Sequence, residues 1–337
     1  MNELRSVLLG FSGGIDSSAA VGVLRQDGYR VVALTLDTTG DEELVATARK
    51  QAAQLSVEHY VKSVKDDFQQ KIISYFISSY AEGRTPAPCT LCNPLIKWHH
   101  LLLEADRLGV EKIATGHYFN VEQVDGNYYV ARAADRRKDQ SYYLWGLSQR
   151  VLERVVTPMG QKIKSDIAVS TAPRKESMGV CFLRGKGYGD FIAEHLPMAV
   201  RSGEIVTLSG KVVGRHEGIA FYTIGQKRGV TGGSVVRIDA ERNLLIVGEN
   251  KDLFHSILEV ENCNIVCEEE LLSADDVQVV VRGFGRNPEG FARAIERIDG
   301  AYRVTLDDPA WAPAVGQPVV FYRGDRVLGG GILERYY

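Results

Sequence analysis

Residues 6–18 read SVLLGFSGGIDSS, and this stretch decides the fold of the first half of the chain. Residues 6–10 form an apolar run of strand length, and residues 17–26 have the pattern of a helix. The glycines between them allow a tight turn and a close approach of the backbone to a ligand. Because N–H groups at a helix N-terminus attract anions, the turn predicts a phosphate-binding loop. No lysine follows in the Walker position, which excludes the usual P-loop.

Apolar strands alternate with helical patterns on both sides of that turn. Further strands are expected at 30–36, 57–61 and 112–115, and further helices at 41–55 and 66–80. This alternation predicts an α/β domain with a doubly wound parallel sheet, in which ligands bind beyond the carboxyl ends of the strands.

The pattern of apolar and polar residues changes after about residue 200. Short alternating segments with Gly-rich turns predict a small antiparallel β-barrel, with strands at 277–281, 291–298, 302–306, 318–323 and 327–333. Residues 203–249 lie between the two patterns and predict a compact linker domain. We therefore expect domains at 1–198, 199–256 and 257–337.

Composition limits the class of protein. The chain has 337 residues, 45% of them hydrophobic and 25% charged, which is typical of soluble globular proteins and excludes a disordered chain. No run of 18 apolar residues is present, so no membrane span is expected. The five cysteines are odd in number and no secretion signal is apparent, which favours reduced thiols in the cytoplasm.

The net charge of −3 argues against a protein that holds nucleic acid by bulk charge alone. The charges are unevenly placed, however. Residues 131–164 contain eight basic and three acidic side chains, whereas residues 251–300 contain five basic and eleven acidic ones. The first of these stretches is therefore a candidate surface for phosphate groups.

Cys89 and Cys92 form a C-x-x-C pair. Asn93 is a good N-cap and Pro94 fits the first helical position, so we expect Cys92 immediately before a helix, where the dipole favours a thiolate nucleophile. A zinc half-site, a redox pair and an iron–sulfur cluster that includes Cys181 are alternatives.

The remaining cysteines give weaker signals. From its neighbours alone, Cys181 is equally well interpreted as a buried strand cysteine. Cys263 and Cys267 are interpreted as ordinary small apolar residues.

The S-G-G-x-D-S motif resembles the pyrophosphate loop of the ATP pyrophosphatase superfamily, whose members split ATP between the α and β phosphates and adenylate a substrate. Together with further blocks in a fixed order, it resembles the tRNA-specific 2-thiouridylases (MnmA family). These blocks are 88–93 with 96–98, 114–118, 138–142, 177–182, 214–218, 222–229 and 328–331.

The resemblance implies a reaction. Members of the family bind ATP with Mg²⁺, adenylate the C2 oxygen of the wobble uridine of tRNA, and replace that oxygen by sulfur, with release of AMP and pyrophosphate. The resemblance further implies that Cys181 receives persulfide sulfur from a cysteine desulfurase or a sulfur-relay protein. Cys92 then assists release of the sulfur, and a Cys92–Cys181 disulfide forms.

The resemblance also implies site residues. The catalytic residues are Cys92, Cys181 and Asp16. The ATP-binding residues are Gly10, Phe11, Ser12, Gly13, Gly14, Ile15, Asp16, Ser17, Leu36 and Gly116. The tRNA-contacting residues are Ala87, Pro88, Cys89, Lys138, Asp139, Gln140, Arg282 and Arg286. No metal ligands of the protein's own are assigned, and we expect a monomer.

Some positions depart from the family pattern. Ala87 stands where members commonly have Asn, Leu36 where they usually have Met, and Cys89 where some have Asp and others Cys. Cys89 keeps a three-cysteine iron–sulfur cluster open as an alternative to the persulfide. Another pyrophosphate-loop sulfurtransferase or ligase, and a non-enzymatic RNA-binding or sulfur-sensing protein, are rival functions. The intact pyrophosphate loop and the presence of both Cys92 and Cys181 favour a tRNA-thiolating enzyme over these rivals.

Overall fold

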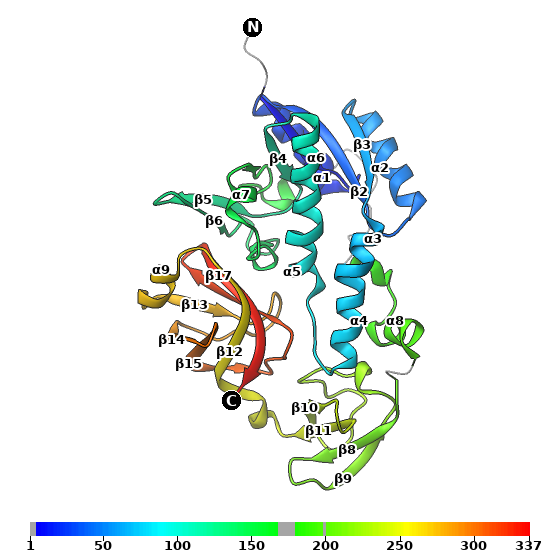
Figure 1. Ribbon diagram of the computed structural model, residues 1–337, viewed down its shortest axis with the longest axis vertical. Coiled ribbons are helices and arrows are strands. Elements are labelled where there is room, and N and C mark those ends of the chain that lie inside the picture. The colour runs from blue at the N-terminus through cyan, green and yellow to red at the C-terminus, as the bar shows by residue number, and fades with distance from the viewer. Residues whose placement is uncertain (1–4, 168–178, 198–199) are drawn as a thin grey trace. The chain divides into compact units, whose positions relative to one another are not determined.

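The computed structural model describes residues 5–167, 179–197 and 200–337 (Figure 1). The chain divides into two compact units. Unit 1 comprises Met1–Ile72, Cys89–Ser177 and Asp325–Leu328, and unit 2 comprises Ile73–Pro88, Met178–Gly324 and Gly329–Tyr337. The predicted boundary at 198–199 lies outside the described residues, so the division into three domains stays a prediction.

Unit 1 is built on a five-stranded sheet in the order β3-β2-β1-β4-β7. Its strands are β1 (Ser6–Gly10), β2 (Arg30–Asp37), β3 (Glu58–Ser63), β4 (Lys112–Thr115) and β7 (Val155–Val156). Every pairing is parallel, and β1 lies in the centre, with Leu9 opposite both Ala33 and Ala114. The doubly wound parallel sheet is thus confirmed, and the carboxyl end of β1 opens directly into the glycine-rich turn.

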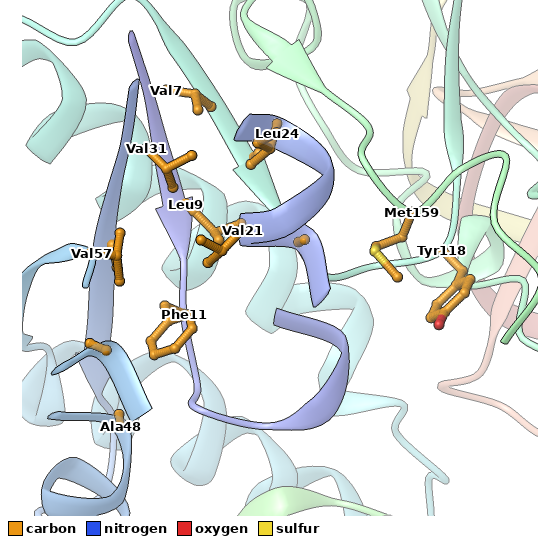
Figure 2. Close-up of a cluster of buried hydrophobic side chains, with 14 of the residues drawn as sticks. Val7, Leu9, Phe11, Val21, Leu24, Val31, Ala48, Val57, Tyr118 and Met159 are labelled. Carbon is orange, nitrogen blue, oxygen red and sulfur yellow. The ribbon is translucent and has the colours of Figure 1, made fainter. Parts of the chain in front are cut away.

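Helices α1 (Ile15–Gln26) and α2 (Glu42–Gln54) cover one face of this sheet. Figure 2 shows the buried cluster in which strand side chains meet helix side chains. Val7 and Leu9 contribute from β1, and Val21 and Leu24 from α1. Leu8, which points the other way in the strand, is also fully buried. Burial on both faces explains why β1 is a continuous apolar run rather than an alternating one.

A helical run precedes β4. Its parts are α5 (Pro88–Cys92), a π-helical turn (Asn93–Lys97) and α6 (Trp98–Leu108), which ends at Gly109 with a left-handed φ of 64°. The sequence analysis placed the helix start at Pro94, which is wrong, because the π turn accommodates this proline inside the run.

The sequence analysis did not anticipate a hairpin of unit 1, formed by β5 (Asn120–Val124) and β6 (Asn127–Ala131). Its turn is Asp125-Gly126, and both residues have positive φ, which is the signature of a two-residue hairpin. The short helix α7 (Gln149–Leu152) also belongs to unit 1.

Unit 2 contains helices from both sides of the chain's middle. The predicted 66–80 helix is present as α3 (Lys65–Phe68), a π turn (Gln69–Ile73) and α4 (Ser74–Ala81), of which α4 belongs to this unit. Helix α8 (Tyr188–His195) packs against α4 through Phe76 and Phe191, with ring centroids 6.1 Å apart.

A four-stranded sheet of unit 2 has the order β10-β11-β8-β9. Its strands are β8 (Gly203–Thr207), β9 (Val212–His216), β10 (Ser234–Asp239) and β11 (Leu244–Gly248). β8 pairs with β11 in parallel, and the other two pairings are antiparallel. The compact region expected at 203–249 is this sheet.

A third sheet contains the strand order β13-β16-β17-β12-β15-β14. Its pairings of β13 with β16, of β17 with β12, of β12 with β15 and of β15 with β14 are antiparallel. Its strands are β12 (Phe254–Ile265), β13 (Val277–Val280), β14 (Ala292–Ile298), β15 (Ala301–Trp311), β16 (Pro318–Arg323) and β17 (Arg326–Tyr336), and helix α9 (Glu268–Ser273) lies between β12 and β13. The predicted antiparallel architecture is confirmed. The 12-residue β12 was missed because its polar and apolar residues do not alternate cleanly.

Candidate active site

The glycine-rich turn lies between β1 and α1 and is tied together by its own hydroxyl groups. The Ser17 Oγ accepts the Ser12 N–H at 3.3 Å and donates to the Gly14 carbonyl at 3.2 Å. The Ser12 Oγ accepts the Gly14 N–H at 3.3 Å. The first turn of α1 leaves backbone N–H groups without intrahelical acceptors. The loop therefore offers N–H and O–H donors in the arrangement that a phosphate group requires.

Two glycines let other backbone come close to this loop. Gly13 has a φ of +70°, and a Cβ placed on it would lie 2.8 Å from the Cα of Ala48. A Cβ on Gly116, in the segment after β4, would lie 2.8 Å from the Ser17 nitrogen. Gly116 thus lies against the start of α1, next to the loop, and its role in ATP binding stays a prediction.

The carboxyl end of β2 lies beside the loop. The Thr35 Oγ donates to the Phe11 carbonyl at 2.6 Å and lies 2.8 Å from the Nε2 of His59. Burial lowers the pKa of His59, so this imidazole is neutral at pH 7. Leu36, a predicted ATP-binding residue, follows Thr35 and is partly exposed near the end of β2. The predicted ATP-binding residues from β1, β2 and the loop are therefore brought together at one edge of the sheet.

Asp16, in the first turn of α1, is engaged by two side chains from far along the chain. The Tyr118 hydroxyl donates to its Oδ1 at 2.8 Å, and the Lys164 ammonium donates to the same oxygen. Sequence reasoning counted Lys164 only among the basic residues of its stretch. The positive charge of Lys164 was the only feature of the sequence that pointed to it, since no periodic pattern surrounds this residue.

His117 lies next to Tyr118 and is held in a neutral form. Its Nδ1 is 2.8 Å from the Oγ of Thr115, and its ring stacks on Trp98 with centroids 6.3 Å apart. Burial, helped by the charge of nearby Lys97, lowers the pKa of His117 to about 3. An uncharged imidazole at this strand end can exchange hydrogen bonds with a ligand without adding charge.

The structure changes the interpretation of Cys92. The helix begins at Pro88, so Cys92 has helical φ and ψ of −61° and −37° and is buried, with 6% of its surface exposed. The expected position directly before a helix N-terminus is therefore wrong. Cys89 occupies the first turn instead and is partly exposed. Ala87 and Pro88, the other predicted contacts of this block, precede and open the helix.

Cys181 is exposed at the start of a 3₁₀ turn, Cys181–Leu183, in unit 2. The alternative of a buried strand cysteine is therefore wrong. Its neighbour Phe182 is buried against Phe76 of α4 and Phe191 of α8, with centroid distances of 5.1 Å and 5.3 Å. The ring anchors the turn and leaves the thiol at the surface.

The predicted tRNA block at 138–140 folds onto its own chain. The Asp139 carboxylate accepts the Ala133 N–H at 2.8 Å and the Ser141 hydroxyl at 2.6 Å. Gln140 and Tyr118 exchange two hydrogen bonds, from the Gln140 N–H at 2.9 Å and to its Oε1 at 3.0 Å. Asp139 and Gln140 thus shape the loop that carries Lys138.

The two predicted arginines of the C-terminal sheet differ in availability. Arg282 donates to the carbonyls of Trp311 and Ala312 at 2.9 Å and 2.6 Å, and its guanidinium lies over the Trp311 ring. The side chain of Arg286 is 53% exposed and lies 5.2 Å from the centroid of Phe254. Arg286 also pairs with Asp308 at 3.8 Å.

Neither of the last two cysteines is fully exposed. Burial raises the pKa of Cys263 to about 12, so its thiol is protonated at pH 7. Across residues 5–167, 179–197 and 200–337, no three His, Cys, Asp or Glu side chains form a group that could hold a metal ion. In the same described part of the chain, no helix has the length and apolar composition needed to cross a membrane.

Three family models match consecutive parts of the chain. They are described as the tRNA methyl transferase HUP domain at residues 5–185, the tRNA methyl transferase PRC-barrel domain at 189–249, and the aminomethyltransferase beta-barrel domain at 255–333. The first alone covers more than half of the sequence.

Curated relatives match over nearly the whole chain. The tRNA-specific 2-thiouridylase MnmA 1 of Clostridium botulinum is 35% identical, over 98% of this chain and 99% of that protein. MnmA 3 of Bacteroides fragilis is 38% identical, over 98% and 94%. MnmA of Clostridium perfringens is 34% identical, over 98% of each. The chain belongs to the MnmA family of tRNA-specific 2-thiouridylases.

Proposed function

We propose that this chain catalyses the ATP-dependent 2-thiolation of the wobble uridine of tRNA. The observation that carries the proposal is the identity of 34–38% to relatives named tRNA-specific 2-thiouridylases, over nearly the full length of both chains. The phosphate loop at the end of β1 and the two cysteines of the matching blocks support it.

The glycine-rich loop supports ATP binding, because it leads into the first turn of α1, whose backbone N–H groups lack intrahelical acceptors and can bind phosphate oxygens. The uridine O2 attacks the α-phosphorus and forms a new O–P bond, while the bond to the β-phosphate oxygen breaks and its electron pair leaves with pyrophosphate. Asp16 would hold Mg²⁺ together with the phosphates, since carboxylates are its preferred protein ligands. The bound metal neutralises charge on the phosphates.

The sulfur steps use Cys181 and Cys92. An exposed Cys181 is reachable by a donor protein, which supports its role as the persulfide carrier. The terminal persulfide sulfur attacks C2 of the activated uridine, and AMP leaves with the C–O electron pair. The Cys92 thiolate then attacks the Cys181 sulfur, which frees the thiolated base and forms a disulfide. A thiol reductant must reduce this disulfide before the next turnover.

The iron–sulfur alternative has weaker support. We derive no step through a cluster. Anaerobic purification followed by iron and sulfide analysis tests this point. We expect substoichiometric iron and full activity, and one cluster per active chain would contradict the persulfide route.

The proposal extends to partners and organisation. We propose tRNA and a cysteine desulfurase or sulfur-relay protein as partners, a monomeric state and a cytoplasmic location. Lys138, in the basic loop, and Arg286, whose side chain is 53% exposed, are among the proposed tRNA contacts. We also propose domain limits at 1–198, 199–256 and 257–337.

A transcript experiment tests the function. The full chain is incubated with ATP, a persulfide donor and a tRNA transcript, and the nucleosides are analysed by mass spectrometry. We expect 2-thiouridine at the wobble position, and none in a matched transcript with cytidine there. The same analysis separates a thiolated from a methylated uridine. AMP formation without any thiolated base, in the presence of a working donor, would contradict the proposal.

A further inference from the structure

The glycine-rich loop lacks the lysine that a Walker loop carries, yet a lysine reaches it from elsewhere. Lys164 lies in a 3₁₀ turn, Lys164–Asp166, and its ammonium donates to the Oδ1 of Asp16 in the first turn of α1. The two residues are 148 positions apart in the sequence. The fold therefore brings a cation to the mouth of the phosphate loop that the loop's own sequence does not supply.

The Lys164 side chain is held in place from several directions. Its backbone N–H donates to the Asp135 carboxylate at 2.9 Å, which fixes the turn. Its ammonium lies 5.9 Å from the ring centroid of Tyr118, whose hydroxyl donates to the same Asp16 oxygen. Only 16% of the side chain is exposed, whereas the neighbouring Lys162 is exposed. The Lys164 ammonium is thus held in a defined position rather than being a solvated surface charge.

We propose that Lys164 binds the β- and γ-phosphates of ATP and the pyrophosphate that leaves, an inference that rests on the proposed adenylation. In the absence of nucleotide, Asp16 is the anion that pairs with it. When the phosphates enter, the ammonium exchanges one Asp16 oxygen for phosphate oxygens, and the carboxylate becomes available to Mg²⁺. As the α-phosphorus bond breaks, negative charge grows on pyrophosphate, next to this ammonium.

Binding of inorganic pyrophosphate and of ATP, each with Mg²⁺ and without tRNA, tests the proposal by titration calorimetry on the full chain. Lys164→Gln removes a charge-assisted contact and is expected to weaken pyrophosphate binding by about 10- to 100-fold. Lys164→Arg should recover part of the affinity. Lys162→Gln, which removes the same charge two residues away, should bind as the wild type does. Thermal unfolding of each variant confirms that it is folded.

The double variant Asp16→Asn/Lys164→Gln, titrated alongside Lys164→Gln with pyrophosphate in the absence of Mg²⁺ so that no metal on Asp16 contributes, separates phosphate binding from a purely structural pairing with Asp16. If Lys164 only neutralised Asp16, removal of both charges would restore pyrophosphate affinity. We expect the double variant to bind no better than Lys164→Gln. Restored affinity, or wild-type affinity in Lys164→Gln, would overturn the proposal. If the wild-type protein bound neither pyrophosphate nor ATP, both the role of Lys164 and the proposed function would be overturned. If it bound them through Lys164 but did not thiolate tRNA, only the proposed function would be overturned.

Discussion

Gly116 shows how one residue controls the phosphate loop. It follows β4, and the space where a side chain would begin is taken by the backbone of α1, with the Ser17 nitrogen 2.8 Å and the Asp16 carbonyl carbon 3.0 Å away. Backbone atoms cannot rotate aside as a flexible side chain can. Any larger residue must therefore push the β4 segment away from the loop.

Gly116→Ala is expected to lower the free energy of unfolding by about 1–3 kcal/mol through overpacking, and to weaken ATP binding. Gly22→Ala is the matched control, because Gly22 lies in α1 with no atom within 4 Å of its added Cβ. That control should be neutral or stabilising by up to about 1 kcal/mol. Chemical denaturation and calorimetry measure both effects, and equal behaviour of the two variants would refute this account of Gly116.

His117 gives the stability a pH dependence. Its pKa is about 3 in the folded chain and near 6.5 when unfolded, so below pH 6.5 the unfolded chain binds a proton that the folded chain does not. Stability is therefore fully present above pH 6.5 and is lost as the pH falls toward 3. His117→Gln removes this part of the loss.

Urea unfolding at pH 7.5 and pH 5 measures the difference. We expect the wild type to lose roughly 1–2 kcal/mol more than the variant between these values. The other histidines are common to both proteins, so their contributions cancel. An equal loss in both proteins would show that His117 titrates normally.

Among the elements, the helical run that starts at Pro88 marks where sequence reasoning succeeds and where it fails. Strand β1 and the turn after it were predictable, because an apolar run and a glycine cluster are local signals. The helix start was not, since Asn93 and Pro94 form a good local start signal that a π turn overrides. The pairing of Lys164 with Asp16 was equally invisible, because no local pattern encodes a contact made by tertiary folding.

The Cys181 turn depends on its aromatic anchor. Phe182→Ala opens a cavity between α4 and α8 and is expected to cost about 3–5 kcal/mol of unfolding free energy. It should also reduce sulfur transfer more than adenylation, measured as pyrophosphate release, because the loop of unit 1 is untouched. Phe291→Ala is the control, since this ring is 50% exposed and should change stability by less than about 1 kcal/mol. Sulfur transfer unaffected in a folded Phe182→Ala would count against the anchor.

For the molecule as a whole, the distribution of charge matters more than its sum. Although the net charge is −3, residues 131–164, which include Lys138, form a basic stretch. If Lys138 contacts a tRNA phosphate, Lys138→Gln weakens binding and lowers the slope of log affinity against log salt by about 1. Lys251→Gln, in the acidic stretch, should leave the slope unchanged. Filter binding across a salt series distinguishes these outcomes, and an unchanged slope for Lys138→Gln would remove it from the interface.

The central claim is that the glycine-rich loop carries out adenylation and the cysteines carry out sulfur transfer. The variant Cys181→Ser tests it most directly, with the wild-type chain and Cys267→Ser as references. Each protein is given ATP, a persulfide donor and a tRNA transcript, and pyrophosphate and 2-thiouridine are measured in the same reaction. We predict that Cys181→Ser still adenylates the tRNA and releases pyrophosphate in a single turnover but yields no 2-thiouridine, while Cys267→Ser behaves as the wild type. Full thiolation by Cys181→Ser would contradict it.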